Sequence, residues 1–221
     1  MNVQLLQEIQ TKLASKSATL VAVSKTYPPE TIQEAYQLGC RDFGENRVQE
    51  LLEKQPLLPP DVRWHLIGHL QTNKVRYIAP FISMIHSVDS LRLLEEINKQ
   101  AAKCGRVIDC LLQFHIAAEE TKFGLSREEA EALLQTGPLK NLSNARICGV
   151  MGMATFTDDE GQIRREFSAL RDTFHWLKTT WFADRPEFRE ISMGMSGDWE
   201  LALEEGSTMV RIGSLLFGKR S

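Results

Sequence analysis

The chain has 221 residues, of which 43% are hydrophobic and 25% are charged, and its formal net charge is −3. This is the composition of an ordinary globular protein, and without a basic block it argues against nucleic acid or an anionic membrane as the main partner. The cysteines Cys40, Cys104, Cys110 and Cys148 show no C-x-x-C spacing. They predict the reduced thiols of a cytoplasmic protein rather than a disulfide framework or a zinc site. No apolar stretch is long enough to span a bilayer, and the N-terminus lacks the apolar run of a signal peptide.

Segments with helical and strand periodicity alternate along the chain. After an amphipathic helix near 2–15, the pattern predicts strands at 19–24, 41–44, 63–67, 84–88, 109–115, 146–151, 189–193 and 209–213. Helices are predicted at 29–39, 46–54, 71–79, 90–103, from 126 onward, and at 160–180 and 198–205. Ser126 with Glu129 forms a capping box, and either Asp89 or Ser90 can cap the helix at 90–103.

The alternation predicts a single (β/α)8 TIM barrel with an extra N-terminal helix. Eight strands separated by helices in a chain of this length are the pattern of that fold. No Pro/Gly/Ser-rich linker divides the chain, so we expect one domain over residues 1–221. A doubly wound sheet is the rival, but the first strand is not followed by the G-x-G-x-x-G fingerprint of its dinucleotide-binding version.

Lys25 ends an apolar run, 20–24, and is followed by a loop that contains Pro28 and Pro29. Lysine is rarely placed at the end of a buried strand for packing reasons. Desolvation lowers the pKa of an amine and makes it a better nucleophile, which is how proteins hold a carbonyl cofactor as a Schiff base. Taken alone, the segment also fits a lysine that extends from the strand end into solvent.

Two loops near the C-terminus predict a phosphate site. In (β/α)8 barrels, the loops after strands seven and eight often bind phosphate. Here they are 192–198, rich in hydroxyls and glycines, and Gly213 with Ser214. Because strands one and eight are neighbours in a closed barrel, this cradle would face Lys25. The alternative is that these glycines and serines only form turns and caps.

Arg211 is predicted to point inward from the last strand, where a buried guanidinium needs an acceptor. A pyridine nitrogen would serve, since arginine partners that atom in some pyridoxal phosphate sites. An ion pair with a barrel carboxylate such as Glu45 or Asp42 is the alternative. The residue by itself does not separate these two possibilities.

Seven short motifs occur in one order within residues 18–218. They are VAVSKT (21–26), FGENRVQE (43–50), WHLIGHLQTNK (64–74), TKFG (121–124), GVMGM (149–153), SMGMS (192–196) and VRIG (210–213). In this order they resemble the pyridoxal phosphate homeostasis protein family, which is similar to the N-terminal barrel of alanine racemase. One position departs from the family pattern, because many members have proline where this chain has His69.

The resemblance implies a protein that binds pyridoxal 5′-phosphate (PLP) without established catalytic turnover and acts in vitamin B6 homeostasis and amino/keto acid balance. By position, Lys25 would form the Schiff base and Arg211 would face the pyridine nitrogen. Asn46 and His65 would border the ring. The residues implied for the phosphate are Ser192, Ser196, Gly213 and Ser214, with a backbone contact from Met195.

A PLP-dependent amino-acid racemase is the alternative function, and it needs a base on each face of the substrate Cα. We expect the second domain of alanine racemase to be missing, and Pro29 replaces the racemase tyrosine that touches the phosphate. An arginine at the ring nitrogen also weakens the cofactor as an electron sink. If a second base exists, His65, His86 and Tyr27 are the candidates. We therefore expect a cytoplasmic monomer that holds PLP and passes it to apo-PLP enzymes, with no catalytic residue and no metal.

Overall fold

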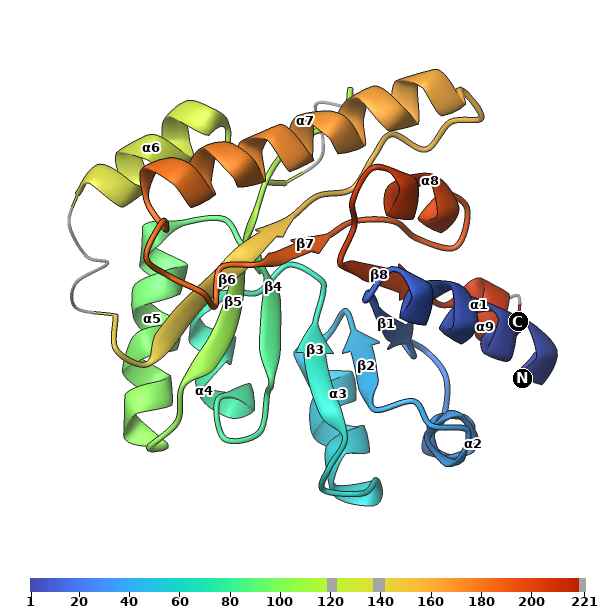
Figure 1. Cartoon of the computed structure of the whole chain (residues 1–221). Helices are drawn as coiled ribbons and strands as arrows, with labels where there is room; N and C mark the ends of the chain where they lie inside the picture. The colour runs from blue at the N-terminus through green and yellow to red at the C-terminus, as the bar shows by residue number, and fades with distance from the viewer. Residues whose placement is uncertain (119–122, 137–141, 219–221) are drawn as a thin grey trace.

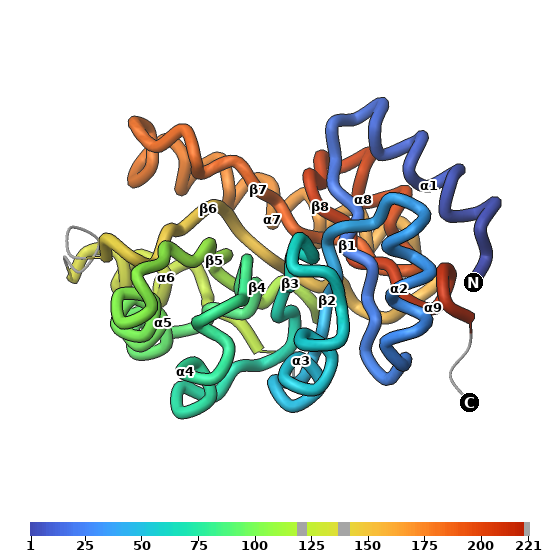
Figure 2. Tube along the Cα trace, turned by 90° about the horizontal axis from the view of Figure 1, so that it is seen from below, coloured from blue at the N-terminus to red at the C-terminus, as the bar shows by residue number. Residues whose placement is uncertain are grey.

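Eight parallel strands close into a barrel in the computed structural model, which describes residues 1–118, 123–136 and 142–218. The strands are β1 (Thr19–Val23), β2 (Asp42–Glu45), β3 (Arg63–Leu66), β4 (Met84–Val88), β5 (Ile108–Gln113), β6 (Ala145–Met151), β7 (Glu190–Ser192) and β8 (Met209–Ile212). Each strand pairs with the next along the chain, and β1 closes the ring on β8, with Val21 opposite Arg211. Figure 2 shows this ring with helices outside it. The predicted (β/α)8 barrel is confirmed.

Helices follow the strands almost where the sequence predicts them (Figure 1). They are α1 (Val3–Ser15), α2 (Pro29–Gln37), α3 (Val48–Lys54), α4 (Val75–Ile78), α5 (Leu91–Lys103), α6 (Arg127–Gln135), α7 (Glu160–Thr180), α8 (Trp199–Glu204) and α9 (Ser214–Phe217). Two 3₁₀ turns, η1 (Gln55–Leu57) and η2 (Thr72–Lys74), complete the described elements.

The largest departures from the predicted helices concern three segments. The helix predicted at 46–54 begins at Val48, because Arg47 is extended with φ −122° and ψ 133°. The helix predicted at 71–79 is divided into η2 and α4, and α9 was not predicted. The late start of α3 matters for function, because it leaves Asn46 in a loop at the mouth of the barrel.

The predicted caps are confirmed where the sequence signal was local. The Ser126 hydroxyl accepts the backbone N–H of Glu129 at 3.1 Å, and the Glu129 carboxylate accepts the N–H of Ser126 at 2.8 Å. Of the two candidate caps for α5, Ser90 is the one used, since its hydroxyl accepts the N–H of Leu93 at 3.4 Å. Both caps satisfy N–H groups that have no partner within the helix.

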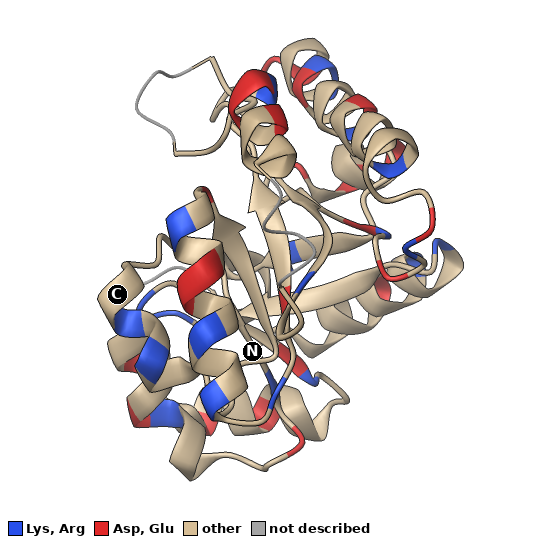
Figure 3. Ribbon diagram, turned by 90° about the vertical axis from the view of Figure 1, so that its left-hand side faces the viewer, with Lys and Arg blue, Asp and Glu red and all other residues tan. Residues whose placement is uncertain are grey.

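Side chains from the strands form two apolar regions. One lies between the strands and the helices and contains Val210 and Ile212, whereas the smaller one fills the barrel and contains Met209. This alternation along β8 directs Arg211 into the barrel, as predicted. Charges of both signs are interspersed over the outer helices, and the strands carry few of them (Figure 3).

The two ends of the described chain meet beside β1. Helices α1 and α9 lie side by side (Figures 1 and 2), and the Asn2 N–H donates to the Leu216 carbonyl at 3.0 Å. Within the described residues, the helices are all too short or too polar to cross a membrane.

Candidate functional site

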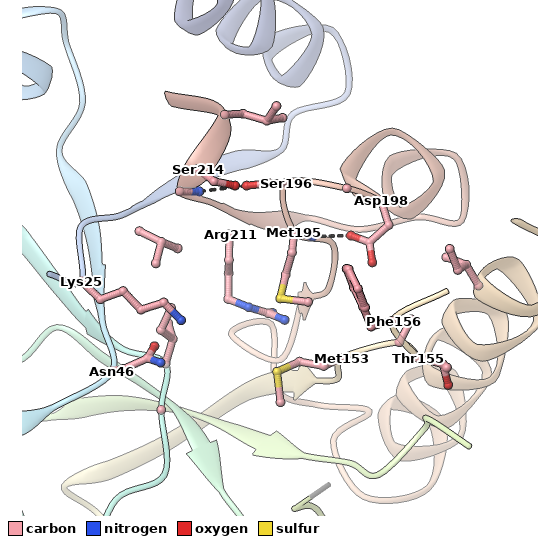
Figure 4. Close-up of a pocket in the computed structure, with 18 of the residues that line it drawn as sticks. Lys25, Asn46, Met153, Thr155, Phe156, Met195, Ser196, Asp198, Arg211 and Ser214 are labelled. Atoms are coloured by element: carbon pink, nitrogen blue, oxygen red, sulfur yellow. Dashed lines mark hydrogen bonds between the residues drawn. The ribbon is translucent and has the colours of Figure 1, made fainter. Parts of the chain in front are cut away.

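A cavity of about 620 Å³ opens at the C-terminal ends of the strands. Its wall is built from the loops that follow β1, β2, β3, β6, β7 and β8 together with smaller contributions from β5 and α7. Most of the residues predicted for the site line it, namely Lys25, Asn46, Met195, Ser196, Arg211, Gly213 and Ser214. In Figure 4, Lys25 and Asn46 reach in from one side, Arg211 occupies the middle, and Ser196 and Ser214 lie together at one end. The roles assigned to these residues remain predictions.

Arg211 is held by oxygen atoms below the cavity floor. One terminal nitrogen donates to the Ser192 carbonyl at 2.8 Å and to the Ser192 hydroxyl at 2.6 Å. The other donates to the Gly152 carbonyl at 3.0 Å. Burial lowers the pKa of Arg211 to about 10, so the guanidinium is still a cation at neutral pH. A guanidinium carries five N–H groups and never accepts a hydrogen bond, so Arg211 still has N–H groups to offer at the surface of the cavity.

The ion pair considered for Arg211 is wrong. Glu45 pairs with Lys54 at 2.8 Å, and Asp42 pairs with Arg63 at 2.5 Å and with His65 at 3.0 Å. Both carboxylates are therefore engaged on the β2–β3 side of the barrel.

A chain of hydrogen bonds continues from Arg211 through the barrel interior. His86 Nδ1 lies 3.0 Å from the Ser192 hydroxyl, and His86 Nε2 lies 2.9 Å from His65 Nδ1. His65 Nε2 then lies 3.0 Å from the Asp42 carboxylate. We call these residues the interior chain: Asp42, His65, His86, Ser192 and Arg211.

The donors in the interior chain can be assigned from its two ends. Because Arg211 must donate to the Ser192 hydroxyl, that hydroxyl can donate to His86 Nδ1. His86 Nε2 then donates to His65 Nδ1, and His65 Nε2 donates to Asp42. His86 is neutral in this assignment. The assignment agrees with His86, whose pKa is held well below its usual range chiefly by burial.

Asp42 provides the acceptor at the far end of the interior chain. Burial alone would raise the pKa of Asp42, but hydrogen bonds from Arg63 and His65 hold it at about 2. The carboxylate therefore stays ionised at neutral pH. With a permanent acceptor at one end and a permanent donor at the other, the hydrogen bonds between them can all run in one direction, from Arg211 toward Asp42.

His65 and Ser192 thus lie beneath the cavity rather than in its wall. His65 is within β3, opposite Gly44 and Met84. Ser192 ends β7 but pairs with Met209, the first residue of β8. In the sequence, His65 and Ser192 lie near strand ends like the other predicted site residues. The strand register places them deeper along the barrel axis than the residues that line the cavity.

Hydroxyl and amide donors gather at the end of the cavity where phosphate was predicted. The Gly213 N–H donates to the Ser196 hydroxyl at 3.3 Å, and Ser214 lies next to them (Figure 4). A side chain at position 213 would crowd β1, since an added Cβ would lie 3.0 Å from the Val23 carbonyl oxygen. Hydroxyls and backbone N–H groups of this kind suit an anion. The Met195 N–H, however, already donates to Asp198 at 2.5 Å.

Sequence reasoning missed the wall formed by the loop after β6. Met153, Thr155 and Phe156 line the cavity there (Figure 4). The buried Glu166 of α7 anchors this loop, because its carboxylate accepts the Thr155 N–H at 2.6 Å and the Thr155 hydroxyl at 2.7 Å. The motif at 149–153 was the available signal, since it leads directly into this loop.

The chain matches a family model described as alanine racemase, N-terminal domain, over residues 4–221. It is 42% identical over 204 residues to a pyridoxal phosphate homeostasis protein of Aquifex aeolicus, covering 92% of this chain and 87% of that protein. Among solved structures, it resembles PipY of Synechococcus elongatus without PLP, with a TM-score of 0.89, 37% identity and coverage of 99% of this chain and 100% of that one. PipY with PLP bound gives a TM-score of 0.86 and 37% identity, with coverage of 98% and 99%.

Proposed function

This chain belongs to the pyridoxal phosphate homeostasis proteins, within the alanine racemase N-terminal domain family, and from that premise we propose that it binds pyridoxal 5′-phosphate and acts in intracellular vitamin B6 homeostasis and amino/keto acid balance. The observation that carries the proposal is one cavity that holds Lys25, Arg211 and a cluster of hydroxyl and amide donors. These are an amine, a fixed cationic donor and an anion site, which are the groups that PLP requires.

Lys25 attaches the cofactor in this proposal. Its Nζ is the amine that would hold PLP through a C=N bond to the aldehyde carbon, with the carbonyl oxygen lost as one water molecule. When bound, PLP supplies an aldehyde carbon that bonds reversibly to amines. Asn46, which lines the cavity next to Lys25, borders the ring.

Arg211 and the serines set the orientation. Arg211 would donate an N–H to the pyridine nitrogen and would leave that nitrogen unprotonated, because a guanidinium does not give up its proton near neutral pH. Ser196, Gly213 and Ser214 bind the phosphate from the opposite end of the cavity. Ser192 and His65 act indirectly, by holding Arg211 through the interior chain.

We propose that the protein holds and releases PLP and does not turn over amino acids. The location of the three candidates for a second base, His65, His86 and Tyr27, supports this proposal, since none of them is among the residues that line the cavity. His65 and His86 are in the interior chain. The Tyr27 hydroxyl donates to the Gly218 carbonyl at 2.7 Å, and its ring packs on Phe217. Delivery to apo-PLP enzymes and a single-domain monomer in the cytoplasm belong to the same proposal; four unpaired cysteines agree with that location.

The test is an absorption spectrum of the purified protein with PLP, before and after borohydride, followed by peptide mapping. We expect a yellow protein whose reduced adduct maps to Lys25 and is lost in Lys25→Ala. Lys99→Ala is the matched control, because Lys99 is exposed on α5, and it should leave the adduct unchanged. A protein that stays colourless with added PLP overturns the proposal. Exchange of the Cα proton of a D- or L-amino acid would instead favour a racemase.

A further inference from the structure

A cluster of polar and charged side chains, most of them buried, lies beneath the backbone on both sides of Lys25. We call it the Lys54 cluster, and it consists of Lys54, Glu45, Glu50 and Ser24. Lys54, the last residue of α3, is only 6% exposed, and Glu45 and Ser24 are completely buried. None of the four lines the cavity. A lysine in such a place must have its charge compensated by specific partners.

Lys54 has three partners, which match the three N–H donors of an ammonium group. Its Nζ donates to Glu45 at 2.8 Å, to Glu50 at 2.9 Å and to the Ser24 backbone carbonyl at 3.0 Å. The lysine thereby joins the end of β2, the first turn of α3 and the residue that precedes Lys25.

The same cluster holds the backbone on each side of Lys25. On one side, the Ser24 hydroxyl donates to Glu45 at 2.7 Å. On the other side, the Thr26 N–H donates to Glu50 at 2.7 Å. Thr26 has φ +70°, a left-handed conformation that is unfavourable for a β-branched residue and persists only where its surroundings impose it.

We propose that Lys54 is a positioning residue for Lys25: through Glu45 and Glu50 it fixes the two peptide units that flank Lys25 and so sets the direction in which the amine enters the cavity. This inference rests on the proposed function, because the direction of the amine matters only if Lys25 bonds to the cofactor. A loop free to take other conformations would present the amine to the aldehyde less often, which slows bond formation.

A role in stability alone explains the cluster less well. Glu45 Oε2 has no hydrogen-bond partner among the described residues, and burial raises the pKa of Glu45 to about 7. The groups around this carboxylate are Lys54, Ser24 and Glu50. Buried ion pairs with incomplete compensation contribute little to folding, and neutral replacements of both partners are often tolerated. Burying these charges costs free energy that a purely structural element could avoid. The contacts of the cluster are made mainly to the residues on either side of Lys25.

The first experiment uses the neutralised pair Lys54→Met with Glu45→Gln. This double variant removes the charges of Lys54 and Glu45 together and leaves Glu50, which is partly exposed and still accepts the Thr26 N–H, so we expect it to unfold near the wild-type temperature. We also expect the borohydride-sensitive Lys25 adduct, followed by its absorbance, to form at least about tenfold more slowly, or its half-maximal formation to require about tenfold more PLP. In a Lys25→Ala background, equilibrium dialysis of PLP should show no effect of the pair, because the residual binding does not involve the amine.

Each result has a distinct meaning. A stable double variant that forms the adduct at the wild-type rate and affinity overturns the positioning role. An equal loss of PLP binding with and without Lys25 also overturns it, because the effect is then a general change in the cavity. If the wild-type protein forms no adduct, the proposed function fails and this inference fails with it.

A second variant keeps the inference testable if the double variant does not fold. Glu50→Ala removes the acceptor of the Thr26 N–H and leaves the Lys54–Glu45 pair intact. Glu53→Ala, at an exposed position of the same helix, is the matched control. We expect slower adduct formation for Glu50→Ala alone. Equal rates for the two variants would contradict the role proposed for the cluster.

Discussion

His86 sits at the centre of the barrel, completely buried, with both ring nitrogens in the interior chain. Burial, together with the neighbouring His65 and Arg211, keeps its pKa well below the usual value of 6.5. The folded protein therefore holds His86 neutral at a pH at which the unfolded chain would take up a proton. Acidification consequently favours the unfolded state through this residue.

We predict that His86→Gln removes this pH dependence. Between pH 7.5 and 5.5, the wild type should lose about 1.4 kcal/mol of unfolding free energy relative to the variant, because one proton is bound only after unfolding. Urea unfolding at the two pH values measures the difference. His175→Gln, at an exposed position of α7, is the matched control for the loss of an imidazole outside the barrel. A constant difference for His86→Gln would mean that His86 takes up its proton in the folded protein over the same pH range as in the unfolded chain, and would contradict the prediction.

At the scale of elements, β6 contains an irregularity that requires close contact with its neighbouring strands. The pairing of β5 with β6 shifts register after Cys110, so that Cys148 is an extra residue in β6. Cys148 and Met151 consequently both face the interior, although strict alternation would separate them. Gly149, next to this bulge, pairs with Glu190 of β7. An added Cβ there would lie 1.8 Å from the Glu190 carbonyl oxygen.

We predict that Gly149→Ala destabilises the fold by more than about 3 kcal/mol, because backbone atoms of two paired strands must separate. The matched control is Gly105→Ala, where φ is +63° and an added Cβ meets nothing within 4 Å. That variant should cost only about 1–2 kcal/mol, from the left-handed backbone conformation. Unfolding in urea compares the two, and equal losses would contradict a role for close strand contact at β6 and β7.

For the whole molecule, binding at the mouth should stabilise every strand that contributes to it. The cavity draws residues from loops distributed around the barrel, so ligand binding and global unfolding are linked.

We predict that PLP at 100 times its dissociation constant adds about 2.7 kcal/mol to the free energy of unfolding. Pyridoxal, which lacks the phosphate, should raise the unfolding temperature less at the same concentration, because it leaves Ser196, Gly213 and Ser214 without a ligand. Thermal unfolding with each compound measures this. Equal shifts for the two would remove the phosphate role from these residues.

Local patterns were sufficient for the elements and for the outline of the cavity. The capping box of Ser126 was readable because it is decided within four residues. Alternation along the last strand was enough to turn Arg211 inward, and the position after a strand was enough to bring Lys25, Asn46 and Gly213 to one end of the barrel. Each of these features depends on contacts or periodicities that are short in sequence.

The fold class and the residues at the strand ends were thus determined by the sequence itself, since strand and helix periods and turn residues encode them. Only the tertiary structure decided how deep in the barrel each side chain lies and which distant residues it contacts. His65 and Ser192 lie below the cavity because the stagger between neighbouring strands, which alternation does not specify, sets how far along the barrel axis a residue lies. Lys54 reaches the flanks of Lys25 for a similar reason: residues 30 positions apart meet through the packing of α3 on the barrel.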